Sequence, residues 1–236
     1  MSVDPLADQM PSWSPYTYTF NNPIRFIDPD GRMPMGPGDP PVRIYTETKG
    51  LGHVFISVGK GENTTVFTYG RYAELNKDKS SARSTTPSGE GVMIKLEGQD
   101  AVDYISSEIN NYDAQSFEIS DADGGKVLDH FNDQMNSSDK VPEVGKYAGD
   151  SRAKVVDTYS LLSNNCTTKS CGGANAGGSY GIGKEKVPDP LNPGMSRTGT
   201  IISPAGLQND LNSKSRRSNS NVRNVTGAVR KEYGID

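Results

Sequence analysis

The sequence predicts an α+β fold, an antiparallel sheet packed with helices, for residues 42–236. Three stretches within residues 41–98 alternate apolar and polar side chains, which is the pattern of half-buried strands. Two later stretches carry apolar residues at helical spacing. A cluster of strands that precedes the helices is typical of the α+β class.

The strands follow from alternation and from one tight turn. PVRIYTET (41–48) and GHVFISVGKGENTTVFTYG (52–70) both alternate, and the Gly-Lys-Gly-Glu-Asn run inside the second predicts a hairpin. GVMIKLEG (91–98) places its aliphatic side chains on one face of a further strand. QSFEISD (115–121) is predicted to return to the sheet.

Helices are predicted for QDAVDYISSEINNYD (99–113) and within DADGGKVLDHFNDQMN (121–136), where apolar residues recur every three or four positions. The Gly- and Pro-rich residues 172–200 predict a flexible loop. From Asn212 onward basic residues stand among serines and asparagines. We expect a flexible C-terminal tail there, partly disordered or ending in a short surface helix.

Composition narrows the function classes. The chain has 236 residues with 33% hydrophobic residues, 26 glycines and 15 prolines, so we expect one compact domain with long polar loops. The net charge of −4 gives no general case for nucleic-acid binding. No apolar run approaches the roughly 18 residues that a membrane span needs, and MSVDPLADQM lacks the features of a secretory signal. We therefore expect no stable membrane insertion, and export by a specialised system if the protein leaves its cell.

The two cysteines, Cys166 and Cys171, leave three chemical roles open. A zinc site would need both histidines, His53 and His130, which lie far apart along the chain, so we expect neither a metal nor another cofactor. A disulfide between the cysteines would close a very small loop and stabilise little. The third role is a nucleophilic thiol paired with a histidine.

Residues 1–41 read as a separate segment. The stretch DPLADQMPSWSPYTYTFNNPIRFIDPDGR (4–32) combines aromatic residues with tight-turn dipeptides, and MPMGPGDPP (33–41) reads as a Pro/Gly-rich linker. The 4–32 stretch resembles the end of the RHS-repeat core in the version common among Bacteroidetes. In that family the domain after DPDGR is a toxin delivered to rival cells.

The RHS resemblance implies that residues 1–41 are a core remnant with its linker and that residues 42–236 are toxin-like cargo. It also implies that the domain is a secreted effector of interbacterial competition. Its expected partners are the secretion machinery, reached through the RHS core, and a cognate immunity protein that covers the site in the producing cell.

Cys166 and His53 carry the chemistry that a thiol hydrolase needs. The run Ser-Asn-Asn before Cys166 predicts a helix start, which places Cys166 in the first helical turn. There the unpaired backbone N–H groups stabilise a thiolate and can serve as an oxyanion hole. His53, at the start of a well-patterned strand, could take the thiol proton.

GHVFISVGKGENTTVFTYGRY (52–72) and YSLLSNNCTT (159–168) resemble the circularly permuted papain-like fold of the PPPDE peptidases and lecithin–retinol acyltransferases. The resemblance implies a cysteine peptidase or amidase with Cys166 as nucleophile and His53 as general base. Thr68 or Tyr69 on the neighbouring strand would orient His53. Asn165 would cap the helix and could help to bind the oxyanion.

Other functions stay open at this point. The same fold could act as a lipid acyl hydrolase or acyltransferase. A nuclease toxin would use His130, Asp129 and the basic tail to engage phosphates. A non-catalytic binding domain would not need Cys166 at all. His130 is predicted to lie on a helix surface, and Cys171 is predicted to pack against the core.

Overall fold

A computed structural model describes residues 40–72, 88–192 and 194–235. The chain divides into two compact units, Met1–Pro40 and Pro41–Asp236. The stretch that carries the RHS resemblance lies outside the described residues. Everything below concerns the second unit.

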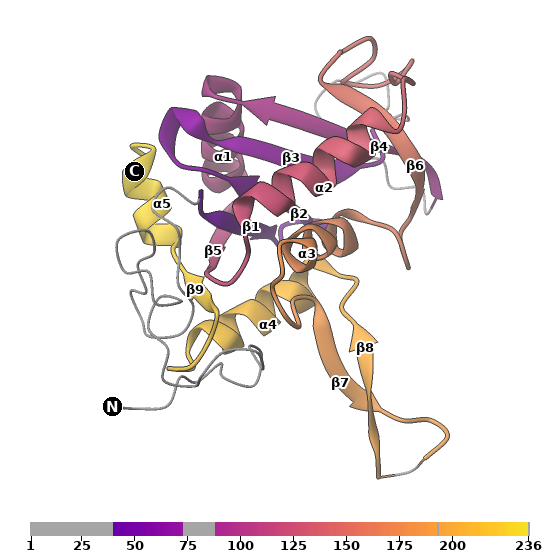
Figure 1. Cartoon of the computed structure of the whole chain (residues 1–236), viewed down its shortest axis with the longest axis vertical. Coiled ribbons are helices and arrows are strands. Elements are labelled where there is room, and N and C mark those ends of the chain that lie inside the picture. The colour runs from indigo at the N-terminus through magenta and orange to yellow at the C-terminus, as the bar shows by residue number, and fades with distance from the viewer. Residues whose placement is uncertain (1–39, 73–87, 193, 236) are drawn as a thin grey trace, which may run out of the picture. The chain divides into compact units, whose positions relative to one another are not determined.

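The second unit is built on one antiparallel sheet, which confirms the predicted α+β class (Figure 1). Its seven strands run in the order β6-β4-β3-β2-β1-β5-β9. Strands that follow each other as hairpins, β1 to β4, lie side by side in its middle. The strands are β1 (Val42–Glu47), β2 (His53–Val58), β3 (Thr65–Gly70), β4 (Ser88–Glu97), β5 (Gln115–Ile119), β6 (Ala153–Ser160) and β9 (Val222–Asn224), with a short 3-10 turn η3 (Gly61–Asn63) between β2 and β3.

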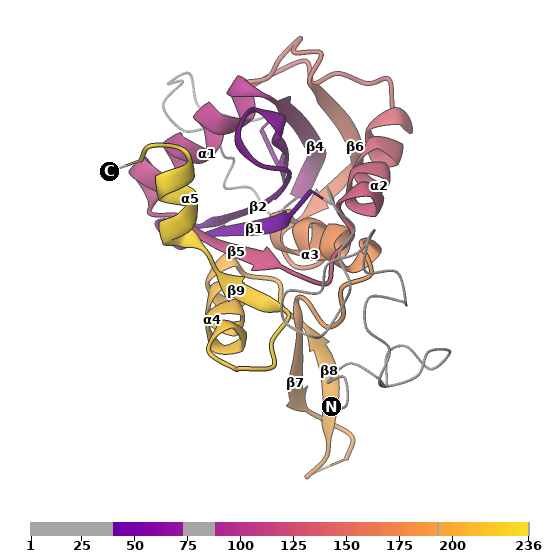
Figure 2. The same cartoon turned by 60° about the vertical axis from the view of Figure 1, so that its left-hand side comes forward.

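Helices cover both faces of the sheet (Figure 2). One face packs against α2 (Gly124–Asn136), α3 (Cys166–Ala176) and α4 (Pro204–Ser215), and we call it the α3 face. The other packs against α1 (Gln99–Tyr112) and α5 (Thr226–Glu232), and we call it the α1 face.

Both faces of β2 are buried because the strand lies in the middle of the sheet with helices on each side. Val54 and Ile56 point into the core of the α3 face, while Phe55 between them packs on the α1 face. Alternating side chains of one strand thus fill two separate cores. All six residues of β2 are buried.

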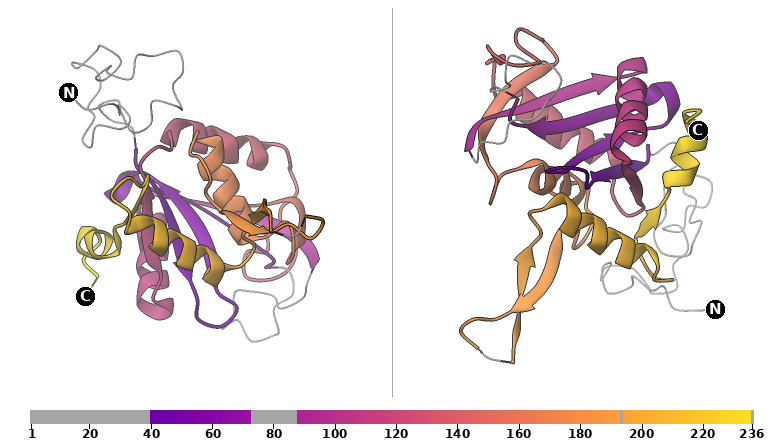
Figure 3. Two further views of the ribbon diagram at one scale, coloured as in Figure 1. Left: turned by 90° about the horizontal axis from the view of Figure 1, so that it is seen from below. Right: turned by 180° about the vertical axis from the view of Figure 1, so that it is seen from behind.

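The prediction of a flexible loop for residues 172–200 is wrong. Most of that range forms the end of α3 and an antiparallel hairpin, β7 (Lys184–Pro188) with β8 (Ser196–Thr200), which projects away from the sheet (Figures 1 and 3). Its strands are largely exposed. Among the described residues they pair only with each other, so the apolar alternation that marks a core strand is missing.

The prediction of a flexible C-terminal tail also differs from the structure. After α4, strand β9 pairs with β5 and α5 packs on the α1 face. The anchors are few but completely enclosed, with Val222 1% and Val229 0% exposed. The expected alternative of a short helix corresponds to α5, whereas one buried valine among polar residues is too sparse a pattern to predict strand β9 from sequence.

No helix within the described ranges is both long enough and apolar enough to cross a membrane.

Candidate functional site

Cys166 is the first residue of α3, and Asn165 is the helix N-cap. The Asn165 side chain accepts a hydrogen bond from the Thr168 backbone N–H at 3.1 Å, and the Asn165 backbone N–H donates to Thr168 Oγ1 at 2.9 Å. This reciprocal capping box satisfies two of the four N–H groups that a helix start leaves without helical partners. The backbone N–H groups of Cys166 and Thr167, beside the thiol, take no part in this capping box.

The amide group of Asn165 is committed to structure. Its Nδ2 donates to the Leu161 carbonyl at 2.7 Å and to the Ile202 carbonyl at 3.0 Å. Because an amide nitrogen carries two hydrogens, both are used. Asn165 therefore fixes the start of α3, and the expected help of its amide in an oxyanion hole is not available in this arrangement.

Replacing Asn165 tests its two structural contributions, the helix cap and the two hydrogen bonds that its amide donates. Asn165→Ala removes the cap and both bridging bonds and is expected to lower the free energy of unfolding by about 2–4 kcal/mol. Asn165→Asp keeps the cap acceptor but replaces both donors by a buried carboxylate oxygen that faces the Leu161 and Ile202 carbonyl oxygens, so its loss should be larger than that of Asn165→Ala. Urea unfolding of both variants measures the difference, and a smaller loss for Asn165→Asp would contradict the assignment of both amide hydrogens to these carbonyls.

His53, the first residue of β2, is 3% exposed. Its Nε2 is hydrogen-bonded to Thr68 Oγ1 at 2.7 Å. The Thr68 hydroxyl also lies 3.2 Å from the Tyr72 hydroxyl and 3.3 Å from that of Tyr104. These partners place the imidazole on the α1 face, where Phe55 packs. Thr68 is thus positioned to hold the ring of His53.

Cys166 and His53 lie at the same end of β2. Asn165 binds the Ile202 carbonyl, and a side chain at Gly52 would meet Cβ of the nearby Pro204 at 3.0 Å. The segment 202–204 therefore lies beside both Asn165, which precedes Cys166, and Gly52, which precedes His53. The thiol, however, belongs to the core of the α3 face, whereas the hydrogen bonds of His53 lie on the α1 face. The structure thus brings both residues, each buried, to one end of the fold.

Tyr69 lies on the α3 face, opposite to Thr68, and does not orient His53. Its hydroxyl donates to Asp157 Oδ1 at 2.5 Å and accepts from Asn164 Nδ2 at 3.2 Å. Burial and the bond to Asp157 raise the pKa of Tyr69 well above its ordinary range.

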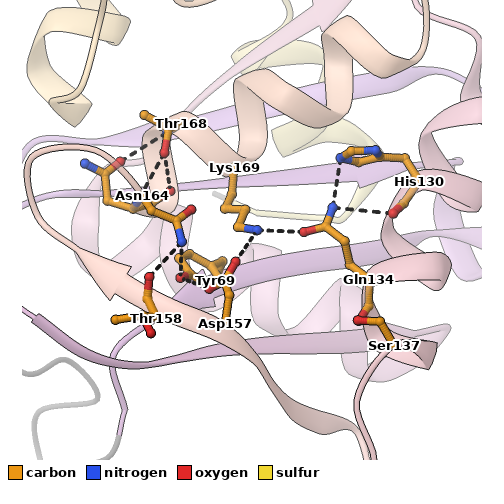
Figure 4. Close-up of polar contacts among 10 residues, drawn as sticks. Tyr69, His130, Gln134, Ser137, Asp157, Thr158, Asn164, Thr168 and Lys169 are labelled. Atoms are coloured by element: carbon orange, nitrogen blue, oxygen red, sulfur yellow. Dashed lines mark hydrogen bonds and ion pairs between the residues drawn. The ribbon is translucent and has the colours of Figure 1, made fainter.

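A polar chain that the sequence did not predict continues from Asp157 (Figure 4). Lys169 Nζ lies 2.6 Å from Asp157 Oδ2 and donates to Gln134 Oε1 at 2.7 Å. Gln134 Nε2 lies 2.8 Å from His130 Nε2. Burial acts to raise the pKa of Asp157, but the bonds from Lys169 and Tyr69 outweigh it and the pKa lies below its ordinary value.

His130 is therefore not an isolated surface residue. It is partly buried on α2, and Gln134 links it to the polar chain of Lys169 and Asp157. Burial, and then the charge of Lys169, lower the pKa of His130. The part of the chain that the structure describes holds no group of three or more His, Cys, Asp or Glu side chains that could bind a metal ion.

Cys171 packs in the core of the α3 face, and neither Cys166 nor Cys171 forms a disulfide. Burial raises the pKa of Cys171 to about 12. A side chain at Gly183 would approach its sulfur to 2.6 Å, so the thiol is tightly enclosed. These features suit a packing residue and not a nucleophile.

Comparisons of the chain with protein-family models, with curated proteins and with solved structures found no match.

Proposed function

We propose that the second unit is a toxin-like cysteine hydrolase that cleaves an amide or ester bond, with Cys166 as its nucleophile. The observation that carries the proposal is the position of Cys166 as the first residue of a well-capped helix packed on the sheet. The N-terminal turn of a helix presents backbone N–H groups and the positive end of the helix dipole to the thiol, which suits both thiolate and oxyanion stabilisation.

The finer parts of the proposal rest on sequence resemblance. We propose a permuted papain-like arrangement, because the strand that begins with His53 precedes the helix that begins with Cys166 and both belong to one sheet-and-helix unit. We also propose that the unit is delivered as the cargo of an RHS-type effector. A cognate immunity protein would then cover the site in the producing cell.

The proposed reaction has two halves. The thiol proton passes to His53, and sulfur attacks the carbonyl carbon while the carbonyl electron pair moves to oxygen, which the N–H groups of Cys166 and Thr167 stabilise. The tetrahedral intermediate collapses to a thioester, and the leaving amine or alcohol takes the proton from His53. Water then attacks the thioester with His53 as base, which releases the acid and restores the thiol.

The role of His53 as proton acceptor sets the strictest geometric requirement of the proposed mechanism. Since Nε2 is bonded to Thr68, the proposal assigns proton transfer to Nδ1. The imidazole must then reach the thiol around the end of β2, where Gly52 and Asn165 approach the same segment.

Toxicity in bacteria tests the proposed function. Residues 42–236 would be expressed in the cytoplasm or with an added export signal, as wild type, Cys166→Ala and His130→Ala, and colony counts compared. We expect killing that needs Cys166 but not His130, and the compartment in which cells die indicates a cell-wall or a cytosolic substrate. Killing that survives Cys166→Ala would overturn the cysteine mechanism, and its loss in His130→Ala alone would favour a nuclease.

A further inference from the structure

The α3 face carries a charge-paired group next to Cys166. Lys169 follows Cys166 by three positions on α3, so both side chains leave the same side of the helix. The Lys169 ammonium lies 2.6 Å from Asp157 Oδ2 and 5.2 Å from the centre of the Tyr69 ring (Figure 4). Its side chain is 17% exposed, and that of Asp157 is 32% exposed.

Asp157 holds this group together. One of its oxygens accepts the Tyr69 hydroxyl at 2.5 Å, and the other pairs with Lys169. Gly91 makes room for the contact, because a Cβ there would lie 2.1 Å from the Tyr69 hydroxyl oxygen and 2.4 Å from Asp157 Oδ1. The local packing is thus arranged around this carboxylate and its two partners.

The thiol lies beside the same group of side chains. Cys166 and Tyr69 belong to one core cluster, Tyr159 packs against it, and the Tyr69 and Tyr159 rings stack at a centroid distance of 5.9 Å. Cys166 is 8% exposed, so water screens electrostatic interactions of its thiol only weakly.

The ionisable groups around Cys166 come from every element packed near it. They are Tyr69 on β3, Asp157 and Tyr159 on β6, Lys169 and Cys171 on α3, His130 on α2 through Gln134, Asp210 and Lys214 on α4 beside Cys171, and His53 at the end of β2. Among these, the Asp157–Lys169 ion pair is joined directly to Tyr69, because the Tyr69 hydroxyl donates a hydrogen bond to Asp157.

We propose that Lys169 and Asp157 are positioning residues that keep the surroundings of Cys166 electrically neutral and so control how readily its thiol ionises. The proposal rests on the proposed function, since it gives these residues a role toward its nucleophile. Removing the cation leaves an uncompensated carboxylate that opposes thiolate formation, and removing the carboxylate leaves a cation that favours it. A purely structural pair would not produce opposite signs.

The test measures the reactivity of Cys166 toward iodoacetamide against pH in the purified full chain, with tandem mass spectrometry to resolve each cysteine. Only the thiolate reacts, so a shift of one unit in the thiol pKa changes the rate about tenfold below that pKa. We expect Lys169→Met to slow Cys166 alkylation at pH 7 by about three- to tenfold and Asp157→Asn to accelerate it similarly. Lys169→Arg, which keeps the charge, should restore the wild-type rate.

Cys171 is the internal control, because a loosened fold would expose it and accelerate both cysteines together. If Lys169→Met and Asp157→Asn both accelerate alkylation of Cys166 and of Cys171, the two residues have only a structural role and the proposal is overturned. Unchanged profiles in all variants overturn it as well.

The outcome is independent of activity. If killing does not need Cys166 but its reactivity shifts with opposite signs, the proposed function fails while the electrostatic control stands. If killing needs Cys166 and the profiles do not move, the reverse holds.

Discussion

Replacing His53 by alanine is expected to lower the hydrolysis rate by about 10²–10⁴-fold, the usual contribution of a positioned proton acceptor. The loss should appear as reduced killing by residues 42–236, in the compartment where the wild type kills, with folding verified by circular dichroism. Thr68→Val should lower the rate less, since it removes the hydroxyl that holds Nε2 but keeps the imidazole. Thr68→Ser, which retains the hydroxyl, is the matched control.

The His53 result also decides how the opposite-face arrangement is understood. Rescue of His53→Ala by added imidazole would indicate that the ring acts as a proton acceptor. Full activity of a folded His53→Ala protein would mean that His53 serves the hydrogen-bond cluster of Thr68, Tyr72 and Tyr104 on the α1 face instead. In that case the acceptor for the Cys166 proton lies elsewhere, and Asp157, which is bonded to Tyr69 on the thiol's own face, becomes the candidate to test.

Gly173→Ala is expected to destabilise the protein by about 1–3 kcal/mol, because it overpacks the interface between α2 and α3. A Cβ at Gly173 would lie 2.3 Å from Cε2 of Phe131. That ring cannot easily move away, since it is 1% exposed and stacked on Phe67 at a centroid distance of 4.7 Å.

Gly172 is the matched control one position earlier in the same helix. Nothing lies within 4 Å of a Cβ placed there, so Gly172→Ala should stabilise the helix by about 0.5–1 kcal/mol through its better helix propensity. Urea unfolding of both variants should therefore show shifts of opposite sign. A stable Gly173→Ala protein would mean that the α2–α3 contact is looser than described.

The sequence predicted what local patterns encode. Strands β1 to β4 follow from alternation, and the Ser-Asn-Asn run indicated the start of α3 because capping is a matter of a few neighbouring residues. Strand β6 was missed because its residues are mostly half-buried and its two faces are not clearly distinguished.

The candidate site was harder to predict because it depends on which face of the sheet each helix covers. Alternation alone places His53 with Phe55 and opposite to Val54. No local signal, however, shows that α3 covers the face of Val54 and α1 that of Phe55. The pair of Lys169 with Asp157 could not be predicted for the same reason, since it joins α3 to the edge strand β6 on the α3 face.

The projecting hairpin of β7 and β8 offers a practical handle on the domain. Its turn is highly exposed, with Leu191 86% and Met195 66% accessible, and its strands pair only with each other. A short epitope or a fluorophore attachment site inserted beside Asn192 would stand clear of the sheet, of the cap at Asn165 and of both cores. Such a label would leave the proposed chemistry untouched, and microscopy could then test the proposed delivery of the domain from one cell into another.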